Sequence, residues 1–351
     1  MDTGRALSGD GGLGAGGFKR PGAAGVSILF SVTILLFIMI GYRVQRNEFY
    51  TGVLMTEFLL IMLPALLFLL IFGYDLKKVL RLNKTRGLNF LLIFFIMLFA
   101  MPLAGVFNLI NLFIVNSIFG KIIVQQPPQA ENLAGLLVNV LVIGGAAGLC
   151  EEFLFRGVVQ RGLERFGNAR AILLAAFLFS LTHMDFQKIF GTFILGVLIG
   201  FLVYRTDSLF SGMFAHFTNN SAAVVLSYAA FKLQSLLKGT GVAAPEQADL
   251  SSFFSSLAGI PKEQLVIVAA FYGFLLLVMV SIFAALIFAF IRLNPVKRGD
   301  VRPAEPAGEK AGLLWLLPGI SFVAVIYFAE VMSFRGISGP FAEQLRRLLG
   351  I

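Results

Sequence analysis

The feature that most constrains this chain is a series of apolar runs, each about twenty residues long, that carry almost no charge. A helix of that length crosses the hydrocarbon core of a bilayer, which is about 30 Å thick. The runs do not alternate apolar and polar residues, so they favour helices over the strands of a membrane barrel. Inside lipid only helices and closed barrels satisfy the backbone hydrogen bonds. The sequence therefore predicts an all-α, polytopic transmembrane helix bundle.

Nine runs qualify as spans, but the sixth is short and the seventh is polar, so we expect eight to nine spans. Their approximate limits are 25–42, 53–74, 88–107, 133–155, 169–186, 189–204, 210–231, 264–291 and 312–334. The third run can end at Pro102 or continue past it. The chain is 58% hydrophobic and 13% charged, against roughly 25% charged residues in soluble domains. This composition excludes a soluble domain and predicts an integral membrane protein, for which we expect the cytoplasmic membrane.

Basic residues gather on one side of the predicted bundle. They concentrate in the loops after the second, fourth and eighth runs, and a few precede the first run. Loops rich in Lys and Arg face the cytoplasm, which predicts a cytoplasmic N-terminus. The net charge of +9 is then explained by the membrane, so the lipid bilayer is an expected partner and nucleic acid is not. The single cysteine, Cys150, excludes an intramolecular disulfide framework and a multi-cysteine zinc site.

Both histidines of the chain and a pair of adjacent glutamates lie in apolar runs, where ionisable residues are costly and indicate function. Gly167 and Asn168 are the natural turn between the fourth and fifth runs. Glu152 lies about fifteen residues before that turn and His183 about fifteen after it. In an antiparallel hairpin the two then lie at equal height, about 22 Å from the tip at 1.5 Å per residue.

The seventh run adds a third helix to this level. His216 and Asn220 are spaced i, i+4 and share a helix face. Their height above the preceding loop, about 10–16 Å, overlaps the height of the glutamate–histidine pair. We therefore expect Glu151, His183, His216 and Asn220 to converge inside the bilayer.

The two glutamates are expected to differ in role. Glu152 and Arg156 are spaced i, i+4 and can form an ion pair along the helix. Glu151 is turned about 100° away and is free to face another helix. We assign Glu151 to chemistry, and Glu152 with Arg156 to a supporting role.

Three short motifs occur in order on separate predicted helices. They are EExxxR at 151–156, FxxxH at 179–183 and HxxxN at 216–220. Together they resemble the motifs of the CPBP family of intramembrane proteases, the CAAX-protease-like or Abi family that includes the Ras-converting CAAX endopeptidases. The resemblance covers about residues 133–235. It implies a membrane endopeptidase core of the eight-helix type.

The resemblance also implies roles for the site residues. Glu151 and His183 would hold and activate a water molecule, while His216 and Asn220 would stabilise the oxyanion. The family has also been described as metal-dependent, and Glu151, His183 and His216 are adequate zinc ligands with water as the fourth. A divalent metal such as zinc and a metal-free site therefore both stay open. No HExxH motif of the zincin type occurs.

The expected organisation is as follows: a flexible cytoplasmic leader at 1–24, N-terminal transmembrane helices at 25–119, the catalytic core at 133–235, an extracytoplasmic loop at 236–263, C-terminal transmembrane helices at 264–334 and a tail at 335–351. The expected substrate is a membrane-associated protein or peptide, with a lipidated one as an option. Two alternatives stay open. The buried Glu and His can line the ion or proton pathway of a transporter, or the chain can be a non-catalytic scaffold or immunity-type membrane protein.

Overall fold

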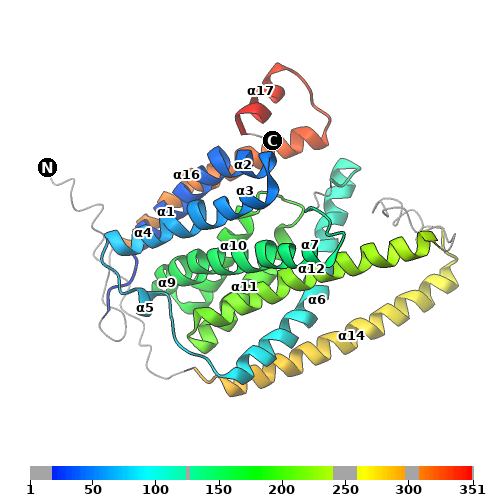
Figure 1. Cartoon of the computed structure of the whole chain (residues 1–351), viewed down its shortest axis with the longest axis horizontal. Coiled ribbons are helices and arrows are strands. Elements are labelled where there is room, and N and C mark those ends of the chain that lie inside the picture. Colours follow the sequence, from blue (N-terminus) through cyan, green and yellow to red (C-terminus); the bar gives the residue numbers. More distant parts are fainter. Residues whose placement is uncertain (1–17, 124–126, 240–258, 297–307, 350–351) are drawn as a thin grey trace.

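The computed structural model describes residues 18–123, 127–239, 259–296 and 308–349, and the elements within these ranges are helices (Figure 1). The first two helical rods are α1–η1–α2 (Ala23–Leu36, Phe37–Gly41, Tyr42–Asn47) and α3–η2–α4 (Phe49–Met55, Thr56–Met62, Leu63–Ile71). The short helix α5 (Leu76–Val79) precedes the long helix α6 (Gly87–Phe119). The fourth rod comprises α7 (Leu133–Asn139), η3 (Val140–Ala146), α8 (Ala147–Glu152), η4 (Phe153–Val159), α9 (Gln160–Leu163) and η5 (Glu164–Phe166).

The second half of the chain continues the bundle. Its helices are α10 (Asn168–Thr182), α11 (Ile189–Thr206), α12 (Leu209–Gly239), α14 (Lys262–Leu293), α15 (Glu309–Gly312), η6 (Leu313–Leu316), α16 (Leu317–Phe334) and α17 (Pro340–Leu349). The predicted all-α polytopic bundle is confirmed. Among the described residues, seven helical rods are long and apolar enough to cross a membrane. Two further helices occupy predicted spans: α10 has only 15 residues, and α12 is more polar.

Several helices are longer than the apolar runs that predicted them. Helix α6 continues through Pro102 to Phe119. The fourth rod extends to Phe166, eleven residues past the expected limit of 155, and α12 extends to Gly239 instead of 231. The extensions of the fourth rod and of α12 contain polar and basic residues, whereas that of α6 is mostly apolar. Apolar length marks the part of a helix in hydrocarbon, whereas the backbone helix continues into the interface.

The predicted leader, outer loop and tail are only partly described. Residues 1–17 and 240–258 lie outside the described ranges. The end of the predicted leader packs on the bundle, since Phe18 stacks on basic side chains and α1 begins at Ala23. The predicted tail contains α17, a helix the sequence analysis did not foresee.

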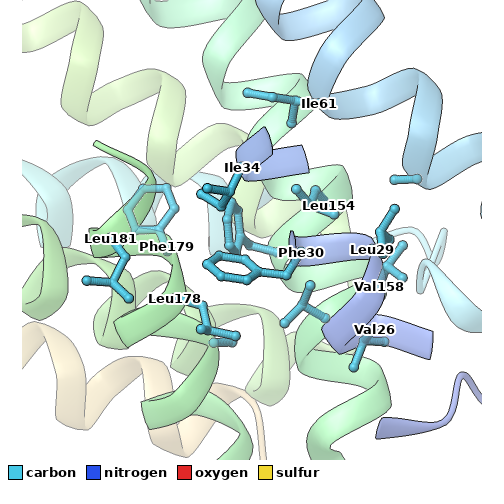
Figure 2. Packing of buried hydrophobic residues seen from close by; sticks show 14 of the residues in the cluster. Val26, Leu29, Phe30, Ile34, Ile61, Leu154, Val158, Leu178, Phe179 and Leu181 are labelled. Atoms are coloured by element: carbon cyan, nitrogen blue, oxygen red, sulfur yellow. The ribbon is translucent and has the colours of Figure 1, made fainter. Parts of the chain in front are cut away.

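Helix α1 runs through the middle of the main apolar core. Its buried side chains pack against η4 and α10, and Figure 2 shows Phe30 and Ile34 lying between Leu154 and Phe179. A second core joins α6, α11, α12 and α14 around Ile96, Leu202 and Phe290. Helix α14 covers one side of the bundle, with only 6% of its apolar window buried. The polar residues of the predicted site lie on helices between these two cores.

Small residues bring the glutamate-bearing rod close to α12. A Cβ at Gly144 would lie 2.5 Å from Ser221 Oγ, and a Cβ at Gly148 would lie 3.1 Å from the backbone nitrogen of Phe217. Two small residues one turn apart let helix backbones approach closely in a membrane. This seam sets α8 beside the turn of α12 that carries His216.

Candidate active site

A buried chain of polar contacts links Arg156, Glu152 and His216. Arg156 Nη1 donates to Glu152 Oε1 at 2.7 Å, and the same oxygen lies 2.9 Å from His216 Nδ1. The exposed fractions of the three residues are 1%, 0% and 4%. Arg156 Nη2 also donates to the carbonyl of Gly196 on α11 at 3.1 Å. The positive guanidinium therefore offsets the negative charge of the buried carboxylate. A charged group buried in a membrane protein needs such a partner.

His216 is flanked by both glutamates. A carboxylate only accepts hydrogen bonds, so His216 Nδ1 carries a proton toward Glu152. The other ring nitrogen, Nε2, lies 3.8 Å from Glu151 Oε2. The predicted pair of Glu152 and Arg156 is present, and it does more than stabilise its own helix. Glu152 orients the imidazole, a contact that the sequence analysis missed.

Phe179 lies at the centre of this group. Its ring is 4.5 Å from Arg156 Cζ and makes edge-on contacts with His183 and His216, with ring centroids 5.0 and 5.7 Å apart. A guanidinium over an aromatic face is an attractive contact. The phenylalanine of the FxxxH motif is therefore the apolar support of both histidines.

His183 caps the C-terminus of α10 and lies beside the Glu151–His216 pair. Its Nδ1 is 3.1 Å from the carbonyl oxygen of Phe179 on its own helix. It lies within electrostatic range of Glu151 and His216 but forms no direct hydrogen bond with either among the described contacts. Of the residues expected to converge, Glu151 and His216 therefore lie in near contact, and His183 lies beside this pair.

His183 also lines a cavity of about 350 Å³. The opposite wall comes from the first and last rods, including Tyr42 and Glu330. Polar residues after α10 complete it: Asp185 pairs with Lys188 at 3.1 Å, and both line the cavity. The cavity gives polar molecules a route to His183 and places Glu330, an acid in an apolar run, beside that route.

Asn220 faces the glutamate rod rather than His216. Its Nδ2 donates to the carbonyl oxygen of Ile143 at 3.1 Å, and its Oδ1 accepts from Asn219 at 3.0 Å. Ile143 lies in the π-helical segment η3, where the wider turn alters the regular ladder of backbone bonds. One amide hydrogen of Asn220 thus binds the carbonyl oxygen of Ile143, and the second does not take part in this hydrogen bond.

Glu57 is a nearby acid that was not among the expected site residues. It is only 6% exposed and lies within electrostatic range of Glu151. Its Oε2, like Glu151 Oε2, has no hydrogen-bond partner among the described residues. The sequence signal that could have identified Glu57 is the position of this ionisable residue in an apolar run. The π-helical segment η2 turns Glu57 inward, and sequence does not reveal such a segment.

The donor set does not fit a three-ligand metal site. Among the described residues, no group of three or more His, Cys, Asp or Glu side chains is placed to hold a metal ion. Glu151, His183 and His216, the predicted ligands, form no such group. No catalytic step is therefore assigned to a metal.

Residues 133–222 match the family model described as "Rce1-like: Type II CAAX prenyl endopeptidase Rce1-like". The match contains all three motifs, and the other spans lie outside it. No curated protein and no solved structure matches the chain. The resemblance to the CAAX-protease-like family is confirmed over this segment. A membrane-embedded endopeptidase is the general activity that the match supports.

Proposed function

We propose that this chain is an intramembrane endopeptidase whose site comprises Glu151, His183, His216 and Asn220. The observation that carries the proposal is the buried contact chain from Arg156 through Glu152 to His216, which ends at Glu151. A structural ion pair needs only Arg156 and Glu152. The added histidine, with its second nitrogen turned to another carboxylate, is the arrangement that acid–base chemistry needs.

Peptide hydrolysis requires a base for the attacking water and a stabiliser for the developing oxyanion. In our proposal Glu151, assisted by His183, takes a proton from water entering through the cavity beside His183. The hydroxyl attacks the scissile carbonyl carbon. In this scheme His216 carries a proton on both ring nitrogens, so that Nε2 and the free amide hydrogen of Asn220 donate to the carbonyl oxygen as it becomes negative. Glu151 then returns the proton to the leaving nitrogen.

Glu152 and Arg156 act as positioning residues in this scheme. Glu152 accepts from His216 Nδ1 and so leaves Nε2 as the nitrogen that meets the substrate. Arg156 holds the carboxylate of Glu152 in place through their 2.7 Å contact. Both groups are buried. If one of them is removed, water cannot replace the contact that the other has lost.

We propose a cytoplasmic N-terminus, because the beginning of α1 and the basic tip around Arg161–Arg170 lie at the same end of the bundle. The family description names a CAAX prenyl endopeptidase. A C-terminal peptide carrying a prenyl group is accordingly the first substrate class to test. Its lipid would lie among the apolar helix faces, and its peptide would enter the polar cavity.

The direct test is product analysis with the purified chain in liposomes. A prenylated C-terminal peptide is incubated in water enriched in ¹⁸O, and the products are weighed by mass spectrometry. We expect a shortened prenyl peptide with one ¹⁸O in its new carboxylate. An intact peptide together with proton or cation flux through the liposomes would favour the transporter alternative. An intact peptide without flux would favour the scaffold alternative.

A second arm of this test addresses the open question of metal. Activity is measured after treatment with a strong zinc chelator and after adding back zinc. For the site described above we expect unchanged cleavage, because the predicted ligands form no group placed to hold a metal ion among the described residues. Loss on chelation with recovery on zinc would assign the reaction to the metal-dependent option.

A further inference from the structure

A second charged cluster lies far from the candidate active site, where α1 begins. Glu164 accepts contacts from three arginines on three separate segments. Arg81 Nη2 is 2.5 Å from Glu164 Oε1, while Arg161 Nη1 and Arg20 Nη1 are 2.8 and 3.7 Å from Oε2. One carboxylate is therefore shared by three guanidinium groups, which leaves positive charge over.

Each of these arginines keeps an unused hydrogen-bond donor. Arg20 Nε, Arg81 Nη1 and Arg161 Nε are buried atoms with no hydrogen-bond partner among the described residues. The three side chains are more than nine-tenths buried, with exposed fractions of 9%, 3% and 7%. A buried donor without a partner costs free energy, more so when it is charged. Three such donors in one cluster point to an anionic ligand.

Arg20 and Arg161 line a pocket of about 420 Å³. Phe18 lines the pocket, and its ring lies 5.2 and 5.1 Å from the two guanidinium carbons. This stacking holds the guanidinium planes in fixed positions. Lys77 and Lys78 on α5 also line the pocket.

The acids near the pocket are already neutralised. Asp207 binds Arg81 Nε at 2.8 Å through Oδ1, and Asn83 at 3.1 Å through Oδ2. Asp75 pairs with Lys78 at 3.5 Å. Burial works against the charge of Arg81, but Glu164 and Asp207 raise the pKa of its guanidinium above the ordinary value. Five basic side chains thus face three carboxylates, and two positive charges remain in excess.

We propose that this pocket binds a phosphate group. A phosphate carries up to two negative charges and three acceptor oxygens, which match the excess charge and the unused guanidinium donors. Its source is either the head group of an anionic phospholipid or a soluble phosphate. The pocket lies at the end of the bundle proposed to face the cytoplasm, where anionic lipids gather. A bound phosphate would join the start of α1, the loop around α5 and the tip of the fourth rod.

The test uses the full chain, delipidated in neutral detergent. Its thermal unfolding is measured with inorganic phosphate against chloride at equal ionic strength. A parallel series uses nanodiscs of phosphatidylcholine alone or with phosphatidic acid. Lys77→Gln removes an exposed pocket lysine, and Lys84→Gln is the matched control, an exposed lysine of the same loop that does not line the pocket. Arg20→Gln removes an unused donor.

We expect stabilisation by phosphate or by phosphatidic acid, and an apparent affinity about tenfold weaker in Lys77→Gln and Arg20→Gln than in Lys84→Gln. Stabilisation by inorganic phosphate identifies a soluble source, and stabilisation by phosphatidic acid alone identifies the head group. The proposal is overturned if neither ligand stabilises the chain, or if Lys84→Gln weakens binding as much as Lys77→Gln does. None of these results depends on proteolysis.

Discussion

His216 is held by carboxylates on both sides, and the two contacts are unequal. The 2.9 Å contact with Glu152 fixes the ring, whereas the 3.8 Å separation from Glu151 leaves that side less tightly bound. The stronger contact belongs to the glutamate that also binds Arg156. Glu152 thus affects stability directly and chemistry through His216, while Glu151 is available to a water molecule.

Glu152→Gln is expected to destabilise the protein. The amide keeps the shape of the side chain but leaves Arg156 buried without its counter-charge, which costs about 3–5 kcal/mol. The measurement is thermal or denaturant unfolding in detergent. Glu263→Gln on α14 is the control, because that glutamate is exposed. Equal stability of the two variants would contradict the role given to the Arg156–Glu152 pair.

Phe179→Leu is expected to lower both stability and activity, because the ring supports Arg156 and both histidines. Loss of the cation–π contact and of the ring packing costs about 1–3 kcal/mol. Phe177→Leu on the same helix is the matched control, since Phe177 is 43% exposed. Activity per folded molecule separates the two effects. A Phe179→Leu enzyme as active as Phe177→Leu would show that the histidines do not need this ring.

The sequence indicated which residues to examine but not how they pair. Motif spacing predicted the level of Glu151, His183 and His216, because spacing along a helix is regular. It did not predict that Glu152 binds His216, since rotation about two helix axes decides which neighbour a side chain meets. Glu57 was not recognised for a related reason: it lies in a π-helical segment, which changes the phase of its helix.

At the scale of elements, helices approach one another most closely at positions occupied by glycine, which has no side chain to separate them. Gly212 on α12 lies against both α11 and the glutamate rod. A Cβ there would lie 2.5 Å from Val203 Cγ2 and 2.8 Å from Glu152 Oε2. The narrow space at this glycine allows Glu152 to reach His216 one turn further along α12.

Gly212→Ala is therefore expected to cost about 1–3 kcal/mol of stability through overpacking and to reduce activity by displacing Glu152. Gly273→Ala on α14 is the control, because a Cβ there meets nothing within 4 Å. The unfolding midpoints and cleavage rates of the two variants are compared. If Gly212→Ala matches its control in both, the close approach of α12 to Glu152 is not required.

The helices themselves were largely predictable, and their ends were not. The apolar runs predicted the nine long helical units of the described residues, because membrane-spanning helices must be apolar where lipid surrounds them. Helix α12 was hardest to recognise, since polar residues such as His216 and Asn220 interrupt its apolar run. Those residues face other helices rather than lipid, and they are the ones that carry the candidate site.

At the scale of the whole molecule, the first and last rods complete what the family segment begins. The cavity beside His183 needs Tyr42 and Glu330 for its far wall, and both residues lie outside the matched segment 133–222. From the sequence these rods are only flanking helices, because no motif in them connects them to the site. Access to His183 is therefore a property of the complete bundle.

The orientation of the bundle gives a fourth prediction. Cys150 is buried, so Cys150→Ala provides a background for single-cysteine labelling. Asn47→Cys and Arg170→Cys both replace exposed residues at turns between helical rods. With a cytoplasmic N-terminus, an impermeant thiol reagent added outside is expected to label position 47 and not position 170. The reverse pattern would place the basic tip outside and contradict the proposed orientation.

Cleavage by Glu151→Gln in liposomes tests the central claim most directly. The amide retains the size of Glu151 but cannot take a proton from water. We expect a folded protein with a cleavage rate lower by on the order of 10²–10⁴-fold per folded molecule. Glu131→Gln, which changes an exposed glutamate, is expected to keep the full rate. If Glu151→Gln cleaves the prenylated peptide as fast as this control, Glu151 is not the base and the proposed site is wrong.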